Sequence, residues 1–386
     1  MAKVVLHWNM DAIDKEGASI NLAFGERSNG KSFQVKHKKG VLPRFEDLFN
    51  YYASYKDKTN IIKMAIENDS EFILVRRWRE EITPALVEKY FDDIDIEKIS
   101  DGKYNMITVY RGEIFLSNWD SSKNKVIRGE KIGYVVALST EQKYAGASFL
   151  KVKNIIFEEF MSRSLYLPHE PAKLMNLYST IDRKRGVVRL WLVGNTISKV
   201  CPYLTEWGIL DTVRHMKQGE IVTKWLPTGD VDEEGREIEV KLAIEYCAST
   251  GSSSFVIGEH KEMLNKGNWQ AELQPKLSKS INEYKKLFHL FFIYKGFKFI
   301  AYYIQDKETK NCCWFIAPFT KEIRDKEFVI SDIIKESPYY TTDIYGGYGI
   351  KSLHPLLDTF TESNIFYAND MTGTDFKQAI NFTIRK

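Results

Sequence analysis

Eight consecutive residues near the start of the chain have the spacing of a phosphate-binding loop. Gly25-Glu26-Arg27-Ser28-Asn29-Gly30-Lys31-Ser32 fits G-x-x-x-x-G-K-S, in which backbone N–H groups surround phosphate oxygens and a helix N-terminus favours negative charge. Lys31 would reach the β- and γ-phosphates, and the Ser32 hydroxyl would bind magnesium. The loop therefore predicts a site for ATP and Mg²⁺. An ordinary glycine turn is the alternative, so the strand before the loop and the helix after it matter as confirmation.

Two adjacent carboxylates follow an apolar run and could complete such a site. Asn154–Phe157 is typical of a buried strand, and Glu158 and Glu159 come directly after it. Ligands of open α/β sheets bind at the carboxyl ends of the strands, so we expect both carboxylates to approach the loop from a neighbouring strand. Glu158 is predicted to belong to the magnesium shell and Glu159 to be the general base or to orient water. A surface turn is the alternative.

An amide and three arginines lie further along the chain. Asn195 follows the apolar run Val188–Val193, where its amide could contact the γ-phosphate or the attacking water. Arg183 and Arg185 lie between the two apolar runs and Arg189 lies at the start of the second, and a guanidinium matches the planar charge of a phosphoryl group in transfer. In a ring of subunits, one of these arginines would reach the ATP of its neighbour. Solvated surface arginines are the alternative.

A further basic segment, Arg76-Arg77-Trp78-Arg79, follows the apolar run Glu71–Val75. Arginine beside an aromatic ring suits contact with phosphate or nucleic acid. Surface ion pairs explain the same composition equally well, so both interpretations of Arg76 and Arg79 stay open.

The elements expected around these residues alternate strands with helices. Ile20–Phe24 would be the strand before the loop, and Ser32–His37 would begin the helix after it. Short runs of β-branched and aromatic residues predict the buried strands of an α/β sheet. Residues 1–240 would form one such domain. Beyond those named above, Tyr134–Leu138 is expected to be a strand, Tyr104–Asn118 a hairpin, and Phe45–Glu67, Pro84–Asp92 and Pro171–Tyr178 helices.

The remaining chain changes character towards its end. Thr228–Glu239 is predicted to be a polar turn, and residues 241–280 a linker subdomain with weak helical periodicity. From Lys286 onwards, three extended runs separated by short turns predict an antiparallel meander. We therefore expect a second domain over residues 281–386, ending in a strand and a helix.

Size and composition agree with this division. A chain of 386 residues exceeds the size at which one core usually keeps growing. The net charge of +3 means that any contact with nucleic acid must use local patches. The four cysteines have no C-x-x-C spacing and are predicted to be reduced. We expect no secretory signal, and the longest apolar region, Leu287–Ile304, is too polar to span a membrane, so a cytosolic protein is predicted.

Several of these segments together resemble the genome-packaging ATPases of phi29-type tailed phages, which are terminase-like DNA encapsidation proteins. The likeness covers the first domain in order and extends weakly to the hairpin Leu290–Tyr303. The segments that carry it are Gly25–Ser32, Ile73–Trp78, Ile155–Phe160, Val193–Asn195 and Pro202-Tyr203.

The resemblance implies a P-loop NTPase fold of the ASCE type with a mainly parallel sheet. It also implies a homopentameric ring on the portal of an empty procapsid, in the host cytoplasm, where ATP hydrolysis translocates double-stranded DNA. A packaging RNA would be a further partner in phages that make one.

Family roles carry over residue by residue. Lys31 and Ser32 match the phosphate-loop pair, and Glu159 matches the catalytic glutamate. Asn195 matches the sensor, and Arg183 an arginine finger acting in trans. Arg76 and Arg79 match basic positions concerned with signalling between subunits or with DNA. One departure is Glu158, because the family usually has aspartate there, and this puts a direct magnesium role for Glu158 in doubt.

The second domain resembles the nuclease module of large terminases, an α+β RNase H-like fold. Such nucleases need a cluster of acidic ligands for two metal ions, the first on the opening strand, and Leu287–Tyr294 carries no carboxylate. A vestigial nuclease domain that binds nucleic acid or portal without cleavage is therefore expected.

Three rival interpretations stay open. A helicase-type or partition-type ATPase would share the phosphate loop, the acidic strand and the arginine. A structural module could bind nucleotide without turnover. An active terminase nuclease could draw its carboxylates from Asp306, Asp358 and Asp370.

Overall fold

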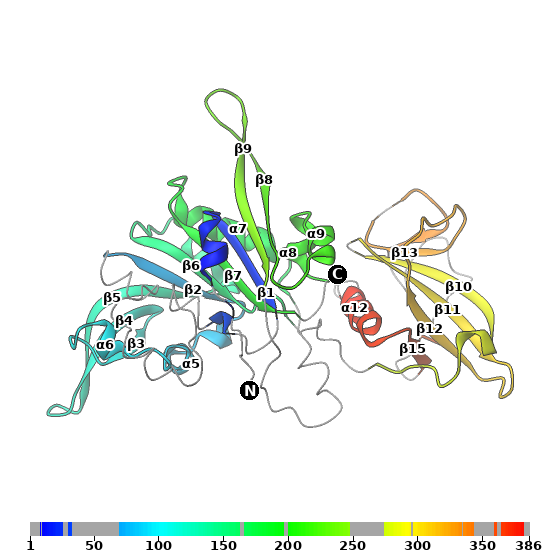
Figure 1. Cartoon of the computed structure of the whole chain (residues 1–386), viewed down its shortest axis with the longest axis horizontal. Helices are drawn as coiled ribbons and strands as arrows, with labels where there is room; N and C mark the ends of the chain where they lie inside the picture. The colour runs from blue at the N-terminus through cyan, green and yellow to red at the C-terminus, as the bar shows by residue number, and fades with distance from the viewer. Residues whose placement is uncertain are drawn as a thin grey trace, which may run out of the picture. The chain divides into compact units, whose positions relative to one another are not determined.

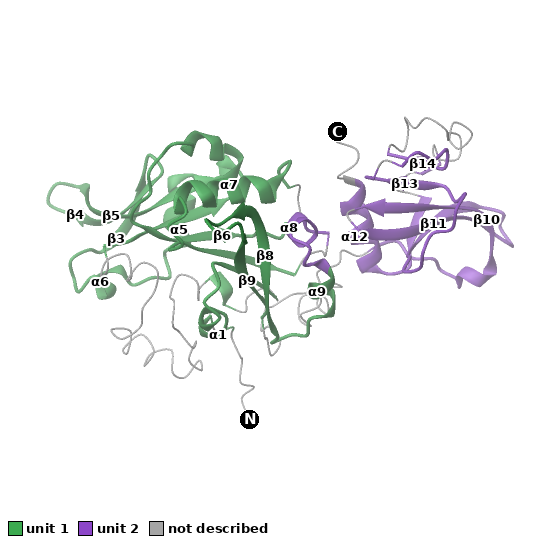
Figure 2. Cartoon of the chain, turned by 90° about the horizontal axis from the view of Figure 1, so that it is seen from above, with its two compact units in different colours: residues 1–196, 211–268 green, residues 197–210, 269–386 purple. Residues whose placement is uncertain are grey.

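The chain forms two compact units, each with its own sheet (Figures 1 and 2). Unit 1 comprises residues 1–196 and 211–268, and unit 2 comprises residues 197–210 and 269–386. The computed structural model describes residues 8, 10–25, 30–32, 69–162, 166–196, 200–247, 274–294, 296–333, 335–342, 359–360 and 364–381. The predicted helix Phe45–Glu67 and most of the predicted helix Ser32–His37 lie outside these residues.

Unit 1 is built on a nine-stranded sheet among the described residues, in the order β3-β4-β5-β2-β6-β7-β1-β9-β8. The central strands from β5 to β9 are parallel, and antiparallel pairs form both edges. This arrangement confirms the predicted mainly parallel sheet. The strands are β1 Ile20–Gly25, β2 Glu71–Arg76, β3 Met106–Tyr110, β4 Glu113–Asp120, β5 Lys125–Ala137, β6 Val152–Glu158, β7 Arg189–Asn195, β8 Ile221–Val231 and β9 Glu237–Tyr246.

The central strands are buried on both faces, which explains their uninterrupted apolar sequences. Every residue of β1 and the first five residues of β2 are buried. Because a parallel strand covered on both faces needs apolar side chains at nearly every position, its run of β-branched and aromatic residues is recognisable in the sequence. The expected strands at 20–24, 71–75, 154–157 and 188–193 are confirmed, as is the hairpin that turns at Arg111-Gly112.

Helix α7, Glu170–Asp182, connects β6 to β7. Leu174, Leu177 and Ile181 are buried at helical spacing, so one stripe of the helix packs on the protein interior. The helix returns the chain to the amino ends of the strands, where β7 begins beside β6 and parallel to it. The other helical segments of unit 1 are α1 Asp11–Lys15, η3 Arg79–Ile82, α5 Pro84–Tyr90, α6 Ile96–Ile99 and η4 Leu138–Tyr144; α9, Leu210–His215, begins at the boundary between the units.

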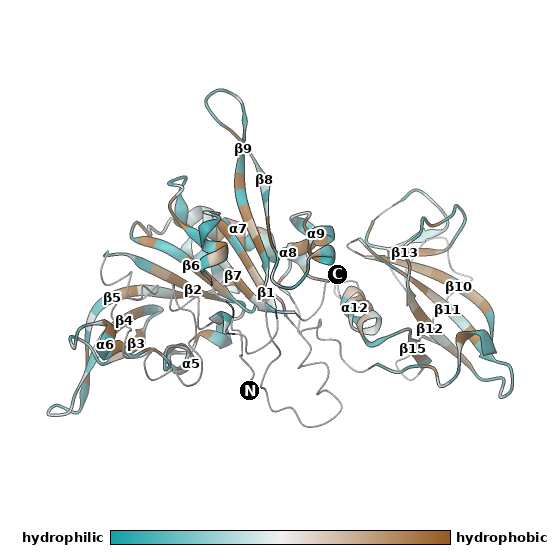
Figure 3. Ribbon diagram, in the orientation of Figure 1, coloured by the Kyte–Doolittle hydropathy of each residue, from teal (hydrophilic) through white to brown (hydrophobic). Residues whose placement is uncertain are grey.

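The predicted boundary at residue 240 is wrong, because β9 crosses it. Leu242 and Ile244 pair with Ile20 and Leu22 of β1, so the segment assigned to a linker contributes a buried strand to the large sheet. In the outer half of β9 charged residues alternate with Ile238 and Val240, and the tip of the β8–β9 hairpin is polar (Figure 3), so the strand lacks the continuous apolar run by which the central strands were predicted. The polar turn is also shorter than predicted, since β8 ends at Val231 and β9 begins at Glu237.

Unit 2 contains a six-stranded sheet among its described residues, in the order β14-β13-β10-β11-β12-β15. Strands β10, β11 and β12 form the predicted antiparallel meander. The ring of Phe376 in the last helix packs on Phe292 and Phe299, with centroids 5.0 and 5.3 Å apart. The elements are α8 Pro202–Glu206, η5 Ile281–Glu283, β10 Tyr284–Tyr294, β11 Phe297–Asp306, β12 Cys312–Pro318, β13 Val329–Ser331, β14 Tyr340–Thr341, β15 Ile365–Tyr367 and α12 Asp370–Asn381.

Candidate nucleotide-binding site

The phosphate-loop sequence leaves the carboxyl end of β1, near the middle of the large sheet. Gly25 is the last residue of β1, and Lys31 and Ser32 already have helical conformation. Gly30 has a φ of +85°, which glycine adopts without the steric cost that a side chain brings. Lys31 is buried. Residues 26–29, the remaining predicted loop positions Glu26, Arg27, Ser28 and Asn29, lie outside the described residues.

Glu158 reaches the loop from the end of β6. The Ser32 hydroxyl donates a hydrogen bond to Glu158 Oε2 at 2.9 Å, and Glu158 is only 5% exposed. Strand β7 lies between β1 and β6. The expectation of a neighbouring strand is therefore wrong by one strand, and the length of the glutamate side chain helps to span this gap.

Tyr90, at the end of α5, also binds Glu158, and no sequence pattern pointed to it. Its hydroxyl donates to Glu158 Oε1 at 2.6 Å, so both carboxylate oxygens accept a hydroxyl group. Burial, and then the negative charge of Glu158, raise the pKa of Tyr90, which keeps the phenol protonated as a donor. An oriented carboxylate beside a serine hydroxyl fits Mg²⁺, which prefers oxygen ligands.

Glu159 lies one residue beyond β6 and differs sharply from Glu158 in exposure. Its side chain is 60% exposed, and its carboxylate forms an ion pair with Arg76 at 3.2 Å. Arg76 ends β2 and also lies 3.8 Å from Glu81. Both contacts are ion pairs within the same chain, as in the second of the two interpretations of Arg76 that the sequence left open. Arg79, at the start of η3, is exposed.

Asn195 ends β7 directly beside the start of the phosphate loop. The parallel register pairs Gly25 with Asn195, and the Thr196 N–H donates to the Gly25 carbonyl oxygen at 2.9 Å. The residue before it must be small, because a Cβ at Gly194 would lie 2.9 Å from the ring of Phe160. The sheet thus places Glu158 and Asn195 at the strand ends beside the segment that carries Lys31 and Ser32.

Arg183 lies near the amino end of β7, opposite to the strand end that carries the phosphate loop, because it follows α7 and precedes β7. A seven-residue strand such as β7 spans about 20 Å, so this arginine lies far from the loop of its own chain. Its guanidinium is exposed and donates to the carbonyl oxygens of Gly146 and Ala147, at 3.0 and 2.7 Å. Arg183 therefore does not approach the phosphate loop of its own chain.

The turn that carries Arg183 is tightly held. Arg183 and Lys184 both have left-handed backbone conformation, with φ of +48° and +61°. The Asp182 carboxylate accepts hydrogen bonds from three backbone N–H groups at 2.9–3.0 Å, those of residues 186, 187 and 188. Arg185 is occupied with backbone carbonyls, and Arg189 pairs with Asp14. Arg183 also donates to backbone carbonyls, but it is the only one of the three arginines that is exposed.

The residues proposed for an active nuclease have other partners. The carboxylate of Asp306 accepts the N–H groups of Glu308 and Thr309 and pairs with Lys279. Asp370 accepts from the Gln274 N–H and pairs with Lys276, and Asp358 lies outside the described residues. Within the described ranges, no group of three acidic, histidine or cysteine side chains could hold a metal ion.

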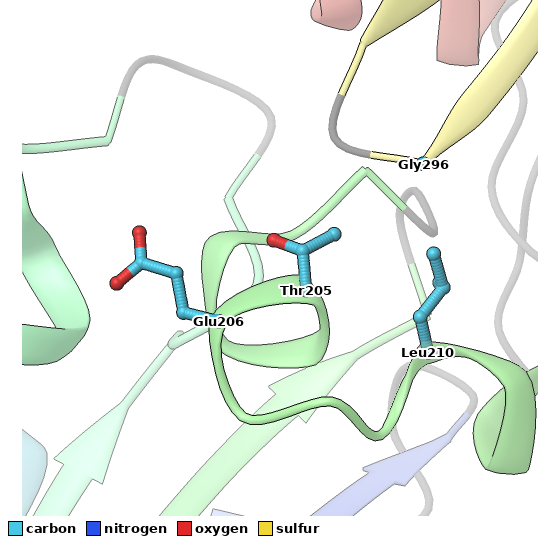
Figure 4. A pocket seen from close by; sticks show the side chains of 4 residues that line it. All are labelled: Thr205, Glu206, Leu210 and Gly296. Atoms are coloured by element: carbon cyan, nitrogen blue, oxygen red, sulfur yellow. The ribbon is translucent and has the colours of Figure 1, made fainter. Parts of the chain in front are cut away.

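One pocket of unit 2 has too few polar groups to define a site. Thr205, Glu206, Leu210 and Gly296 line it (Figure 4), so it offers one carboxylate and one hydroxyl. None of the helices in the described part of the chain has the length and apolar character needed to cross a membrane.

The phosphate-loop sequence follows the first strand of a mainly parallel sheet, and Glu158 is hydrogen-bonded to the serine of the loop. These features place the chain in the class of phosphate-loop α/β proteins. The model of the Podovirus DNA encapsidation protein (Gp16) family matches residues 2–245. The chain belongs to this family, which confirms the resemblance predicted from the sequence.

Individual relatives agree with the family assignment. The DNA packaging protein of Bacillus phage phi29 is 30% identical over 197 residues, and that of Bacillus phage B103 is 28% identical over 163 residues. These matches cover 50% and 42% of this chain, and 48% and 46% of the relatives, so the chain spans about half the length of the curated relatives it matches. A chain of the solved bacteriophage Phi-29 viral genome packaging motor assembly shares the fold, with a TM-score of 0.52 at 18% identity, covering 98% of this chain and 100% of that one.

Proposed function

We propose that this chain is an ATPase that binds ATP with Mg²⁺ at the phosphate loop and uses hydrolysis to move double-stranded DNA into a phage procapsid. The observation that carries the proposal is the hydrogen bond from Ser32 to Glu158. It joins the predicted magnesium ligand of the loop to the acidic end of β6, which is the arrangement that phosphoryl transfer requires. The names of the phi29 and B103 relatives supply the link to DNA packaging.

Each residue has a role that follows from its chemistry. Lys31 binds the β- and γ-phosphates, and Ser32 and Glu158 hold the magnesium shell, with Tyr90 orienting Glu158. Bound magnesium neutralises charge on the phosphate oxygens. Glu159 takes a proton from, or orients, the attacking water, and Asn195 contacts the γ-phosphate or that water. The position of β7 between β1 and β6 supports the ASCE type.

Arg183 acts in trans under this proposal. Its distance from the loop of its own chain excludes a role there, and its exposure on a rigid turn suits contact with a neighbouring subunit. A guanidinium at the γ-phosphate stabilises charge in the transition state. This requires a ring of subunits, for which we propose the pentamer that the family resemblance implied.

Unit 2 is proposed to be a vestigial RNase H-like domain that docks on portal, DNA or a packaging RNA without cleaving nucleic acid. An antiparallel meander followed by β13, which is parallel to β10, supports the fold. Strand β10 carries no carboxylate, which supports the loss of cleavage. The site of action would be the procapsid in the host cytoplasm.

Steady-state ATP turnover with and without double-stranded DNA tests the proposal. We expect turnover that DNA stimulates and that Glu159→Gln lowers by about 10²-fold or more, as is typical for loss of a general base. Nucleotide binding should survive the substitution. Binding without turnover under any condition, including added procapsid, would instead support a nucleotide-binding module. Strand separation driven by ATP would support a helicase, and cleavage of plasmid with Mn²⁺ would support an active nuclease.

A further inference from the structure

A buried ion pair next to the site is not used by any role assigned above. Arg77 follows β2, and Glu170 begins α7; their side chains are 4% and 0% exposed. Arg77 Nε donates to Glu170 Oε2 at 2.8 Å, and Nη2 donates to Oε1 at 2.9 Å. Glu170 Oε2 also accepts the Leu167 N–H at 2.8 Å. This bidentate geometry fixes the plane of the guanidinium.

The same guanidinium holds the turn after β6. Nη1 and Nη2 of Arg77 each donate to the carbonyl oxygen of Glu159 at 3.1 Å, and Nη2 donates to that of Phe160 at 2.9 Å. The rings of Phe157 and Tyr166 lie 5.5 and 5.0 Å from the guanidinium carbon. The cation is therefore enclosed by a carboxylate, two carbonyl groups and two aromatic rings.

Glu159 has a backbone conformation that needs such support. Its φ is +58°, in the left-handed region that is unfavourable for residues with a Cβ atom and persists where surrounding contacts impose it. The backbone conformation sets the direction in which the Cβ atom leaves the chain. Because the Glu159 side chain is 60% exposed, little packing around it can correct that direction.

We propose that Arg77, oriented by Glu170, is a positioning residue for the predicted catalytic carboxylate. Arg77 fixes the left-handed turn and so sets the direction of Glu159, whereas Arg76 contacts the carboxylate itself. Consecutive residues at the end of β2 thus control the backbone and the side chain of one glutamate. The inference rests on the proposed ATPase function, since it assigns Glu159 the role of general base.

The test removes the ion pair without leaving one buried charge unpaired, which a single substitution would do. Arg77→Met with Glu170→Met supplies two apolar side chains instead. We expect kcat for ATP to fall by about 10²-fold, as for a misplaced catalytic group, and KM for ATP to stay within about two-fold, because ground-state binding is unaffected. Arg77→Lys, which keeps the charge but not the fork of donors, should lower kcat in the same direction and replaces the double variant if that does not fold.

A matched control lies on the same helix. Lys173 of α7 pairs with the largely buried Glu141 at 3.2 Å, away from the turn after β6. Lys173→Met with Glu141→Met should leave kcat unchanged. An equal loss of kcat in this control would show that any damage to α7 suffices, and would overturn the specific role of Arg77.

Two further measurements separate this inference from the proposed function. In a Glu159→Gln background, the two methionine substitutions should cause no further loss of turnover, because the group that they misplace is already absent. Amide hydrogen exchange at Phe160, whose N–H donates to the Val193 carbonyl oxygen at 3.3 Å, should be faster in the double variant whether or not ATP is present. Unchanged kcat and unchanged exchange would overturn the positioning role while Glu159→Gln still supports the ATPase. Wild-type turnover that Glu159→Gln does not lower would overturn both.

Discussion

Glu158 stands where the family resemblance leads us to expect the shorter aspartate. Its extra methylene adds rotational freedom, which a precise magnesium shell cannot tolerate. Hydroxyl donors on both carboxylate oxygens, from Ser32 at 2.9 Å and from Tyr90 at 2.6 Å, remove that freedom. We therefore expect Glu158 to depend on the Tyr90 hydroxyl for its orientation. The magnesium dependence of turnover measures this effect.

Tyr90→Phe should weaken the dependence on magnesium rather than on nucleotide. A hydrogen bond to a charged group contributes about 1.5–3 kcal/mol, so the Mg²⁺ concentration for half-maximal turnover should rise by about ten-fold or more. Titrating Mg²⁺ at saturating ATP measures this shift. Tyr178→Phe is the control, because its hydroxyl binds the Val188 carbonyl oxygen at 3.1 Å. Identical magnesium curves for wild type and Tyr90→Phe would refute the role of Tyr90.

Glu245 predicts a pH dependence of stability. It lies in β9 beside Ala23 of β1 and is 5% exposed, and burial raises its pKa from 4.5 to about 7. The folded protein therefore holds this proton more tightly than the unfolded chain does. Stability is greatest below the unfolded pKa and falls as the pH rises towards 7, because only the unfolded chain ionises freely in that range.

Glu245→Gln should remove this pH dependence. We compare the free energy of unfolding of the variant with that of wild type at each pH. This difference should be about 2–3 kcal/mol more favourable to the variant at about pH 8 than at about pH 5, as expected for a shift of roughly two to three pKa units. Urea unfolding at both pH values measures the difference. The exposed Glu237 of the same strand supplies a control, since Glu237→Gln should show no such gain. A constant difference between Glu245→Gln and wild type would contradict the prediction.

Among the secondary-structure elements, β1, β2, β6 and β7 could be predicted because strands buried on both faces require an apolar run. Strand β9 could not be predicted in this way, because charged and apolar residues alternate in its outer half and only residues 242–245 are buried. The loop, Glu158 and Asn195 each follow such a run. Their position at the carboxyl ends of the strands was therefore also predictable.

The supporting contacts of the site left no signal in the sequence. Tyr90 binds a residue 68 positions away, Arg76 one 83 positions away, and Arg77 one 93 positions away. Which of these segments meet is decided by the strand order, in which β2 lies beside β6. Spacing along the chain cannot report such contacts.

If Arg183 acts in trans, as proposed, the turn between α7 and β7 supplies a catalytic group to a neighbouring subunit. Arg183→Ala should lower turnover by about 10³–10⁵-fold, the range for an arginine finger, and leave ATP binding intact. Lys184→Ala changes the next exposed side chain of the same turn and should have little effect. ATP turnover and fluorescent-nucleotide binding distinguish these outcomes.

Mixing Arg183→Ala subunits with Glu159→Gln subunits tests the geometry directly. In a mixed ring, a site with intact Glu159 can receive Arg183 from a Glu159→Gln neighbour, so part of the turnover should return. No recovery at any mixing ratio would count against action in trans.

For the molecule as a whole, a net charge of +3 means that the proposed contact with DNA would have to use local basic patches. Contacts with phosphate release counterions, and a protein with several such contacts loses about 10³–10⁵-fold in affinity between about 50 and 200 mM salt. We therefore expect DNA stimulation of ATP turnover to disappear over this range while turnover without DNA persists. Parallel loss of both activities would indicate salt damage to the nucleotide site.

Strand β7 has a mechanical consequence. Its first residue follows the turn that presents Arg183, and its last residue is Asn195 beside the phosphate loop. Hydrogen bonds to β6 on one side and β1 on the other make this segment stiff, so the turn and the amide are held at a fixed separation. In a closed ring, the residue that faces the neighbouring subunit and the residue beside the subunit's own phosphate loop would then belong to one rigid strand. Coupling between adjacent nucleotide sites would therefore need no long-range rearrangement.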